Sequence, residues 1–422
     1  MIMTFIYFLA MHLFYLALLA VSPFNRKALQ WIKGRQGWRT RLGEWNKEHL
    51  PVIWFHAASL GEFEQGRPLM EEIKKLNHYK ILLTFFSPSG FEVRKNFAGA
   101  DLILYLPLDT PYNARRFIRF VKPSVTIFIK YEFWYYYLRE LHRNHSPVYL
   151  ISALFRPGQV YFRDLGIWFR KKLGYVDYFF LQDDGSARLL KKAGLNRMMV
   201  CGDTRFDRVH AIVSAALPVE TAALFSSGKF CIVAGSTWPK DEELLIKYIN
   251  EDKNGIKWII APHEINEAGL LRLESGLNRQ SVRFSQAVSE NMQQADILII
   301  DSIGMLSSLY RYGQLAYIGG GFGKGIHNIL EATAYGIPVI FGPNHSKFRE
   351  AVELLHAGGA FTCSNQIGLS EIIYRLRNDK TMYDQASAKA AAYVKHNTGA
   401  TRMILDHLLN ASVLQNVAPV NE

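Results

Sequence analysis

Cysteine and the short motifs of metal and nucleotide chemistry are scarce in this chain of 422 residues. The three cysteines, Cys201, Cys231 and Cys363, lie far apart and form no Cys-x-x-Cys pair. This argues against a zinc site or a disulfide framework and favours a reducing compartment. The motifs Asp-x-Asp, His-Glu-x-x-His and Gly-x-x-x-x-Gly-Lys-Ser/Thr are also absent. The sequence therefore predicts no bound metal or other cofactor, and it argues against a P-loop nucleotidase and a zinc hydrolase.

Charged residues are missing from the stretch 2–21, in which only His12 interrupts an apolar run. About 20 apolar residues can cross a bilayer as a helix, and the positive charge that usually precedes the apolar part of a cleaved signal peptide is missing. By the positive-inside bias, we expect residues 1–48 to form a membrane anchor and a basic juxtamembrane segment, with the remaining chain in the cytoplasm. The alternatives are a helix lying in the membrane interface and a helix buried against the first domain. The positive residues that follow the run are Arg26, Lys27, Lys33, Arg35, Arg39 and Arg41.

Neither strong hydrophobicity nor high charge density marks the chain as a whole. Hydrophobic residues make up 49% and charged residues 20%, which fits neither a disordered chain nor a protein with many membrane spans. The net charge of +12 predicts an anionic partner, such as phospholipid head groups, a phosphorylated substrate or nucleic acid. Because the charge is dispersed and no reader motif accompanies it, nucleic-acid binding is the least favoured of these.

Short apolar runs alternate with segments of helical character in two successive series. This alternation indicates parallel sheets covered by helices on both faces. An Ala- and Ser-rich region at 208–228 separates the series, so we expect two doubly wound α/β domains, residues 49–210 and 228–411. We expect the helical stretch 387–409 to cross back to the first domain. The predicted strands are 52–56, 80–86, 102–106, 125–129, 148–152 and 178–182, then 230–234, 256–261, 297–300, 315–318 and 338–341.

A glycine-rich turn, 319–325, follows one predicted strand of the second domain. Glycines let the backbone approach a ligand closely, and the N–H groups that begin the next helix attract a phosphate. Asn328 would cap this helix and Glu331 would accept hydrogen bonds from ribose; the alternative is that the two form only a capping box. Three further turns follow neighbouring parallel strands and should meet at the same sheet edge, which indicates a nucleotide site. These turns are 235–237, 261–263 and 301–306.

Two carboxylates follow predicted strands of the first domain. Glu62 closes the turn 57–62 at the start of a helix, where it can accept a proton from an attacking hydroxyl group. The alternative is a cap favoured by the helix dipole. Glu132 follows the strand that ends at 129 and should reach the same edge, and its alternative is a surface pair with Lys130.

Arg205 lies in a polar turn, 201–207, near the predicted domain junction. A guanidinium there can stabilise negative charge that develops on a leaving phosphate. The alternative is a structural ion pair with Asp203 or Asp207.

These motifs, in chain order, resemble those of the CMP-Kdo-dependent 3-deoxy-D-manno-octulosonic acid (Kdo) transferases, and the resemblance covers nearly the whole chain. Each motif is short, but the ordered set is specific. Besides the N-terminal apolar stretch, the segments are Ser59-Leu-Gly-Glu62, Glu132-Phe-Trp134, Gly202-Asp-Thr-Arg-Phe-Asp207, Gly319-Gly-Gly321, His327-Asn-Ile-Leu-Glu331 and Pro338-Val-Ile-Phe-Gly-Pro343.

The resemblance implies a GT-B fold of two facing Rossmann-like domains and a metal-independent, inverting transfer of Kdo from CMP-Kdo to a lipid A precursor. Glu62 matches the family's general base, and Glu132 matches a carboxylate thought to support the transition state. Arg205 stands where the family often has Lys, which preserves the charge but changes its geometry. The implied CMP contacts are Pro262, His263, Gly304, Met305, Leu306, Asn328, Ile329, Leu330 and Glu331.

Two positions depart from the family pattern. His263 and Glu264 follow Pro262 where the family commonly has Pro-Arg-His, and Met305 replaces the Glu of a Gly-Glu-Leu segment. Without the fixed positive charge, phosphate binding should rely more on helix N-termini, on His263 or on another Arg.

The partners implied by the resemblance are CMP-Kdo, a lipid A precursor and the anionic surface of the inner leaflet. The implied location is the bacterial inner membrane, with the catalytic domains on its cytoplasmic face. A basic stretch beside Trp168 and Phe169 is a candidate membrane contact, or otherwise an ordinary solvated helix face. The rival interpretations are a GT-B enzyme that uses a UDP-sugar and a catalytically inactive relative that binds nucleotide sugar or lipid. The basic residues of this stretch are Arg163, Arg170, Lys171 and Lys172.

Overall fold

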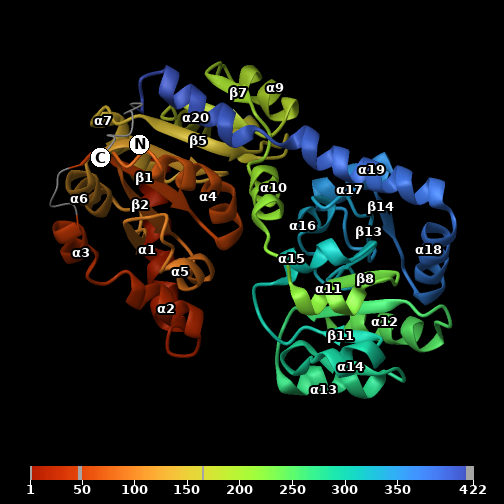
Figure 1. The fold of residues 1–422 in the computed structure, drawn as a ribbon. Coiled ribbons are helices and arrows are strands. Elements are labelled where there is room, and N and C mark those ends of the chain that lie inside the picture. The colour runs from red at the N-terminus through yellow and green to blue at the C-terminus, as the bar shows by residue number, and fades with distance from the viewer. Residues whose placement is uncertain (1, 46–49, 164–165, 415–422) are drawn as a thin grey trace, which may run out of the picture. The chain divides into compact units, whose positions relative to one another are not determined.

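The computed structural model describes residues 2–45, 50–163 and 166–414, which form two compact units. Unit 1 holds the chain up to Arg208 together with the segment from Thr398 onward, and unit 2 holds Val209–Asn397. Figure 1 shows the chain leaving unit 1 through α10 (Arg205–Ala215). Each unit contains one parallel sheet, so the predicted α/β class is confirmed.

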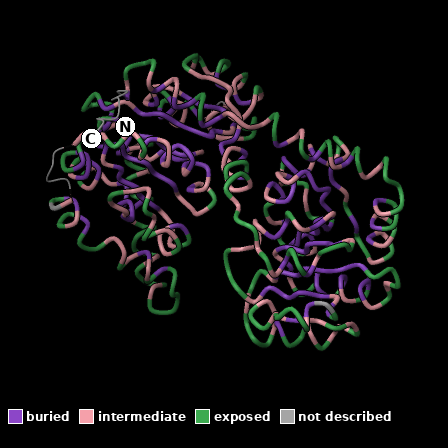
Figure 2. Tube along the Cα trace, in the orientation of Figure 1, coloured by how far each residue is buried: buried purple, intermediate pink, exposed green. Residues whose placement is uncertain are grey.

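Unit 1 is built on a seven-stranded sheet in the order β3-β2-β1-β4-β5-β6-β7. Helices cover both faces of its central strands, which are buried in Figure 2, and this explains their continuous apolar sequences. The strands are β1 (Val52–Ala57), β2 (Lys80–Phe85), β3 (Leu102–Tyr105), β4 (Pro123–Ile129), β5 (Val148–Ala153), β6 (Tyr178–Leu181) and β7 (Met198–Val200). The helices between them are α4 (Leu60–Lys74), α5 (Pro88–Arg94), α6 (Pro111–Val121), α7 (Tyr135–Arg143), α8 (Ile167–Leu173) and α9 (Asp184–Lys192).

Unit 2 repeats this design with the order β10-β11-β9-β8-β12-β13-β14. Its core is again formed by apolar strand residues beneath helices. The strands are β8 (Cys231–Thr237), β9 (Lys257–Pro262), β10 (Ser281–Arg283), β11 (Ile297–Ile299), β12 (Leu315–Ile318), β13 (Val339–Phe341) and β14 (Ala360–Thr362). The helices are α11 (Glu220–Ser226), α12 (Pro239–Glu251), α13 (Glu267–Gly276), α14 (Ser289–Gln294), α15 (Leu306–Leu309), α16 (Leu330–Thr333), α17 (Arg349–Ala357), α18 (Gln366–Asn378) and α19 (Lys380–Asn397).

The strand order reverses at one point in each sheet. In unit 1 this point lies between β1 and β4, and in unit 2 it lies between β8 and β12. In open parallel sheets, ligands bind outside the carboxyl ends of the strands at such a switch point. Each unit therefore has one place where a ligand site is expected.

The C-terminal helix α20 (Ala400–Asn410) packs on unit 1, as the predicted return of the chain requires. The predicted boundary of the second domain at residue 411 is therefore too late. The Asp207 carboxylate accepts hydrogen bonds from the backbone N–H groups of Gly399 (2.5 Å) and Thr401 (2.7 Å), which fixes the start of α20 on unit 1. Ile404 and Leu408 then bury their side chains against α4 and the sheet of unit 1.

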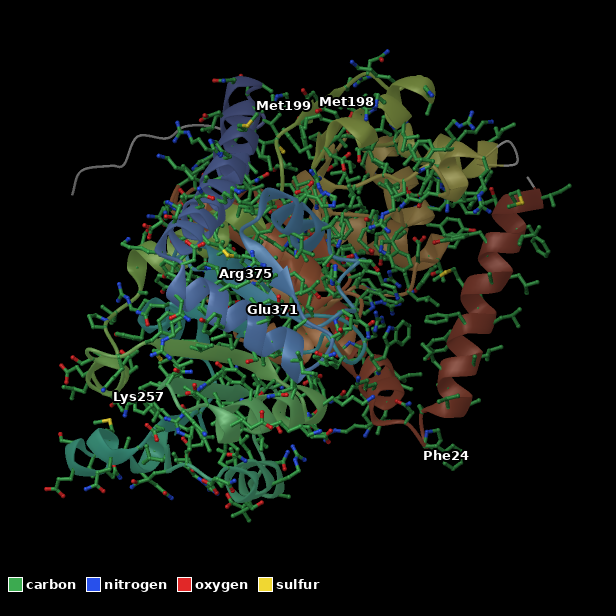
Figure 3. The ribbon with its side chains drawn as sticks, turned by 90° about the vertical axis from the view of Figure 1, so that its right-hand side faces the viewer. Phe24, Met198, Met199, Lys257, Glu371 and Arg375 are labelled. Atoms are coloured by element: carbon green, nitrogen blue, oxygen red, sulfur yellow. The ribbon has the colours of Figure 1, made fainter. Side chains whose placement is uncertain are left out.

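Three helices precede the first sheet: α1 (Ile2–Val21), α2 (Arg26–Gly34) and α3 (Trp38–Trp45). Among the described residues, α1 is the one single helix that is long and apolar enough to cross a bilayer, with a mean hydropathy of 2.1. Figure 3 shows α1 running along the side of unit 1, with Phe24 in the turn that follows it. Most of its side chains are exposed, so the alternative of a helix buried in the first domain is wrong.

Candidate active site

Glu62 lies at the switch point of unit 1, in the first turn of α4 and directly after β1. Its carboxylate accepts a hydrogen bond from the Ala58 backbone N–H at 2.6 Å, so the proposed capping contact is present. Burial raises the pKa of Glu62 to about 7, and the nearby Glu132 charge raises it further than the opposing Lys130 charge lowers it. A carboxyl group with this pKa exchanges protons readily near neutral pH, as a general base must.

Glu132 lies at the other side of the same switch point, between β4 and α7. Its Oε2 atom is 3.1 Å from Nε2 of His56 and accepts a hydrogen bond from the Trp134 indole N–H at 2.6 Å. His56 is completely buried on β1, and its Nδ1 atom lies 2.8 Å from the Thr84 hydroxyl. The carboxylate is thus held by His56 and Trp134, while Lys130 lies over the Tyr131 ring.

Arg205 forms an ion pair with Asp203, its Nη2 atom lying 2.8 Å from Oδ2. Asp203 is buried and also accepts hydrogen bonds from the Gln65 side-chain amide. The structural alternative for Arg205 is therefore present, with Asp203 as the partner, because Asp207 is engaged by the start of α20. About a third of the Arg205 side chain is exposed.

The glycine turn of unit 2 follows β12, at the switch point with β8. A Cβ atom on Gly319 would collide with the Ser236 carbonyl oxygen and lie 2.6 Å from Cα of Thr237. Gly320 has a φ of +92°, and its N–H donates a hydrogen bond of 2.8 Å to the buried carboxylate of Asp241. These glycines are required by the close packing of the turn against β8.

A cavity of about 490 Å³ opens beside this turn, within unit 2. Three flat rings stack at its edge: the His263 ring lies 4.6 Å from Trp238 and 4.2 Å from His327. Burial and the neighbouring His263 lower the pKa of His327 to about 4, so this imidazole is neutral at physiological pH. Lys240 and Lys324 also line the cavity, and neither has an ion-pair partner in the described part of the chain.

The predicted CMP contacts fall into two groups. Pro262 and His263 end β9 beside the stacked rings. Gly304, with a φ of +100°, and Met305 precede α15. Leu306 lies against the end of β8, because a Cβ on Gly235 would be 3.0 Å from its Cδ1 atom.

The remaining predicted contacts surround the start of α16. Asn328 accepts a hydrogen bond from the Leu330 N–H at 3.1 Å and donates one to Glu331 at 3.0 Å. These bonds hold both side chains at the start of α16, where the N-cap residue is Ile329, not Asn328, and ribose binding by Glu331 stays a prediction. Ile329 and Leu330 are buried in the core, so their side chains face away from solvent.

Sequence reasoning missed Trp238, Lys240, Asp241 and Lys324 at the cavity. A Trp and a Lys directly after the 235–237 turn, and a Lys within the glycine turn, were the available signals. Asp241 could be found only from the fold, since its partners Gly320 and Tyr317 are remote in sequence. Within residues 2–45, 50–163 and 166–414, no group of three or more His, Cys, Asp or Glu side chains is arranged to hold a metal ion.

Comparison with solved structures identifies the fold. Solved structures with the same fold include UDP-N-acetylglucosamine 2-epimerase from Neisseria meningitidis bound to UDP-GlcNAc (TM-score 0.61, 15% identity, 86% of this chain and 100% of that one). Another is a glycosyltransferase from Rickettsia africae (TM-score 0.54, 11% identity, 87% and 100%). The chain thus has a GT-B fold.

The family follows from sequence. The model of the 3-deoxy-D-manno-octulosonic-acid transferase (kdotransferase) family matches residues 36–208. The 3-deoxy-D-manno-octulosonic acid transferase of Aquifex aeolicus is 30% identical over 324 residues, 75% of this chain and 84% of that protein. The transferase of Haemophilus influenzae is 26% identical over 409 residues, 91% of this chain and 93% of that protein. The chain belongs to the Kdo transferase family, and it is a glycosyltransferase.

Proposed function

We propose that this enzyme transfers Kdo from CMP-Kdo to a lipid A precursor during lipopolysaccharide synthesis, at the cytoplasmic face of the bacterial inner membrane. The observation that carries the proposal is Glu62. In a chain of this family, a half-buried carboxylate with a pKa near 7 at the switch point of unit 1 is suited to activate an acceptor hydroxyl group.

In the proposed reaction, Glu62 accepts the proton of an acceptor sugar hydroxyl as its oxygen attacks the anomeric carbon of Kdo. The new C–O bond forms on the face opposite the departing CMP, so the configuration inverts. The bond between the anomeric carbon and the phosphate oxygen breaks, and its electron pair leaves with CMP. The pKa of Glu62 allows it to release this proton to water near neutral pH before the next turnover.

Glu132 has two proposed tasks at this site. Its negative charge raises the pKa of Glu62, which makes that carboxylate a stronger base. Its second proposed task is to stabilise the positive charge that develops on the sugar ring in the transition state. The bonds from His56 and Trp134 hold its position while it does so.

The donor is proposed to bind at the switch point of unit 2. The neutral His327 ring and Trp238 offer flat surfaces on which a cytosine base can stack. Lys240 and Lys324 supply positive charge at the cavity, which in this proposal compensates for the Arg that the family commonly has beside His263. We also propose that the positive charge of Arg205 stabilises the negative charge that develops on the leaving phosphate.

The proposal is tested by measuring nucleotide release from CMP-Kdo and from UDP-sugars, with and without a lipid A precursor in detergent. We expect CMP release that depends on the acceptor, and no UDP release. Acceptor-dependent release of UDP, without release of CMP from CMP-Kdo, would show that the enzyme is a GT-B glycosyltransferase that uses a UDP-sugar. Nucleotide binding without any turnover would support the alternative that the protein is a catalytically inactive member of the family.

A further inference from the structure

The first half of α1 is fastened to unit 1 by specific polar contacts. The Tyr7 hydroxyl donates a 2.6 Å hydrogen bond to Asp109, a carboxylate that is only 1% exposed. The Trp168 indole N–H donates to the Thr4 hydroxyl at 3.2 Å, and the Tyr136 hydroxyl donates to the Thr4 carbonyl at 3.4 Å. Because a buried carboxylate is left poorly satisfied when a partner is lost, these contacts oppose detachment of the helix.

The second half of α1 packs on the same unit through apolar side chains. Met11 is buried in a cluster with Trp31, and the Phe14 ring lies 5.6 Å from Trp31 and 6.2 Å from Phe86. Leu18 packs against the same cluster. The contacts therefore run from Thr4 to Leu18, a length of about 21 Å along the helix axis.

The opposite face of α1 is apolar and exposed. Its side chains have no covering element among the described residues, and Phe24 in the following turn is 91% exposed (Figure 3). An apolar helix with one face on protein normally turns its other face to lipid or to a partner. The residues of this face, each between 47% and 76% exposed, include Ile2, Phe5, Ile6, Leu9, Leu13, Leu16 and Val21.

Basic residues lie at both ends of α1. At its start, α8 carries Arg170 and Lys171, whereas the neighbouring Lys172 is buried, with its ammonium group over the rings of Tyr7 and Trp168. At its end, α2 carries Arg26, Lys27 and Lys33. If α1 crossed a bilayer while docked, one of these basic ends would be drawn through the hydrocarbon core, at a cost of several kcal/mol for each charge.

We propose that α1 does not span the membrane but lies along its surface, docked on unit 1, with its exposed face in the acyl and head-group boundary of an anionic bilayer. The apolar face supplies burial in lipid, and the basic residues at both ends supply attraction to phosphate head groups. The inference rests on the membrane attachment in the proposed function, but not on the reaction. It replaces the spanning anchor that the sequence favours.

This arrangement brings the membrane surface close to the catalytic carboxylates. Phe14 of α1 packs on Phe86, the Phe86 ring stacks on Trp134 at 4.6 Å, and Trp134 donates to Glu132 at 2.6 Å. A lipid-anchored acceptor can then present its sugar to unit 1 without leaving the bilayer.

The first test is the side of the membrane on which α1 begins. A short tag containing one cysteine is added before Met1 of the full chain, and intact spheroplasts are treated with an impermeant maleimide. We expect labelling only after the cytoplasmic face is opened, as for the matched control Lys27→Cys, which is cytoplasmic in either arrangement. Labelling of the tag in intact spheroplasts would show a spanning helix and overturn the inference. Neither result depends on turnover, so the reaction is judged separately.

The second test is binding of the purified full-length protein to phosphatidylglycerol vesicles. Leu9→Gln with Leu13→Gln removes apolar area from the exposed face without adding charge, and we expect vesicle affinity to fall at least tenfold, with an unchanged melting temperature in detergent. The matched control is Leu217→Gln with Leu224→Gln, two exposed leucines of unit 2 that should leave binding unchanged. Equal binding by both double variants would contradict a lipid-facing α1.

Discussion

The two units share one sheet topology but carry different chemistry at the corresponding point. At the β1–β4 switch point of unit 1, two carboxylates stand close enough for Glu132 to raise the pKa of Glu62. At the β8–β12 switch point of unit 2, the site carries glycines, stacked rings and two lysines. The first is an acidic, partly buried site, and the second is a cavity lined by glycines, rings and two lysines. In the proposed function, the first site transfers the proton and the second binds the nucleotide.

The glycines of the two switch points show how differently the two turns are built. Gly61 lies in the first turn of α4 with nothing within 4 Å of the place where a Cβ would stand. Gly319 packs so closely on β8 that a Cβ would meet its backbone. Unit 1 continues directly into a 15-residue helix, whereas unit 2 first folds a tight loop around Asp241.

Gly319→Ala should cause the largest change among the variants that compare the two turns. The added methyl group must displace the backbone of β8 or of the turn, so we expect donor affinity to fall about ten- to hundredfold. Gly61→Ala is the matched control and should leave donor affinity unchanged. Isothermal titration with CMP measures both; equal affinities would show that the turn is not part of the donor site.

Glu132→Gln should reduce turnover about tenfold and shift its dependence on pH. Removing the charge of Glu132 lowers the pKa of Glu62 below about 7, so the acidic limb of the kcat/KM profile should move to lower pH. Trp134→Phe removes a hydrogen bond but keeps the charge, and its limb should stay near 7. An acidic limb at the same pH in Glu132→Gln and in wild type would contradict the influence of Glu132 on the pKa of Glu62.

Glu62→Gln should stabilise unit 1 at pH 8. The pKa of Glu62 is about 7 in the folded chain against an ordinary 4.5, so the folded state binds more protons between these values and loses stability as pH rises through them. Allowing for partial exposure, we expect the variant to gain about 1–3 kcal/mol at pH 8 and almost nothing at pH 4.5. Thermal melts at the two pH values measure this; an equal gain at both would exclude a titrating Glu62.

Lys324→Ala should have the smallest effect. An exposed ammonium group near a phosphate contributes at most about 1 kcal/mol, so we expect the KM for the donor to rise about three- to fivefold, and less in high salt. Lys347→Ala, at another exposed lysine of unit 2, is the control. Equal KM values for both variants would contradict a role of Lys324 in donor binding.

Much of the fold was predictable because it rests on local patterns. Apolar runs marked every long strand, and the glycine turn marked the end of β12. The strands β7, β10 and β14 were missed. All three lie at sheet edges, where their residues are less buried and less uniformly apolar than those of the equally short β11 and β13, which were predicted. The edge positions of Glu62 and Glu132 followed directly from the parallel order of β1 and β4.

The contacts that tune the site were not predictable, because they join remote residues. His56 meets Glu132 across 76 residues, and Trp238 meets His327 across 89. The docking of α1 depends on Tyr7 and Asp109, which are 102 residues apart. Apolar composition alone could not distinguish a helix packed along a domain from one that crosses a bilayer.

The most direct test of the division between the two switch points is a paired measurement on wild type and Glu62→Gln. CMP binding is measured by titration, and acceptor-dependent CMP release from CMP-Kdo is measured on the same preparations. We predict equal CMP affinity and a turnover that falls about 10²- to 10⁴-fold in the variant, the usual contribution of a general base. Full turnover by Glu62→Gln would contradict the assignment of proton transfer to unit 1.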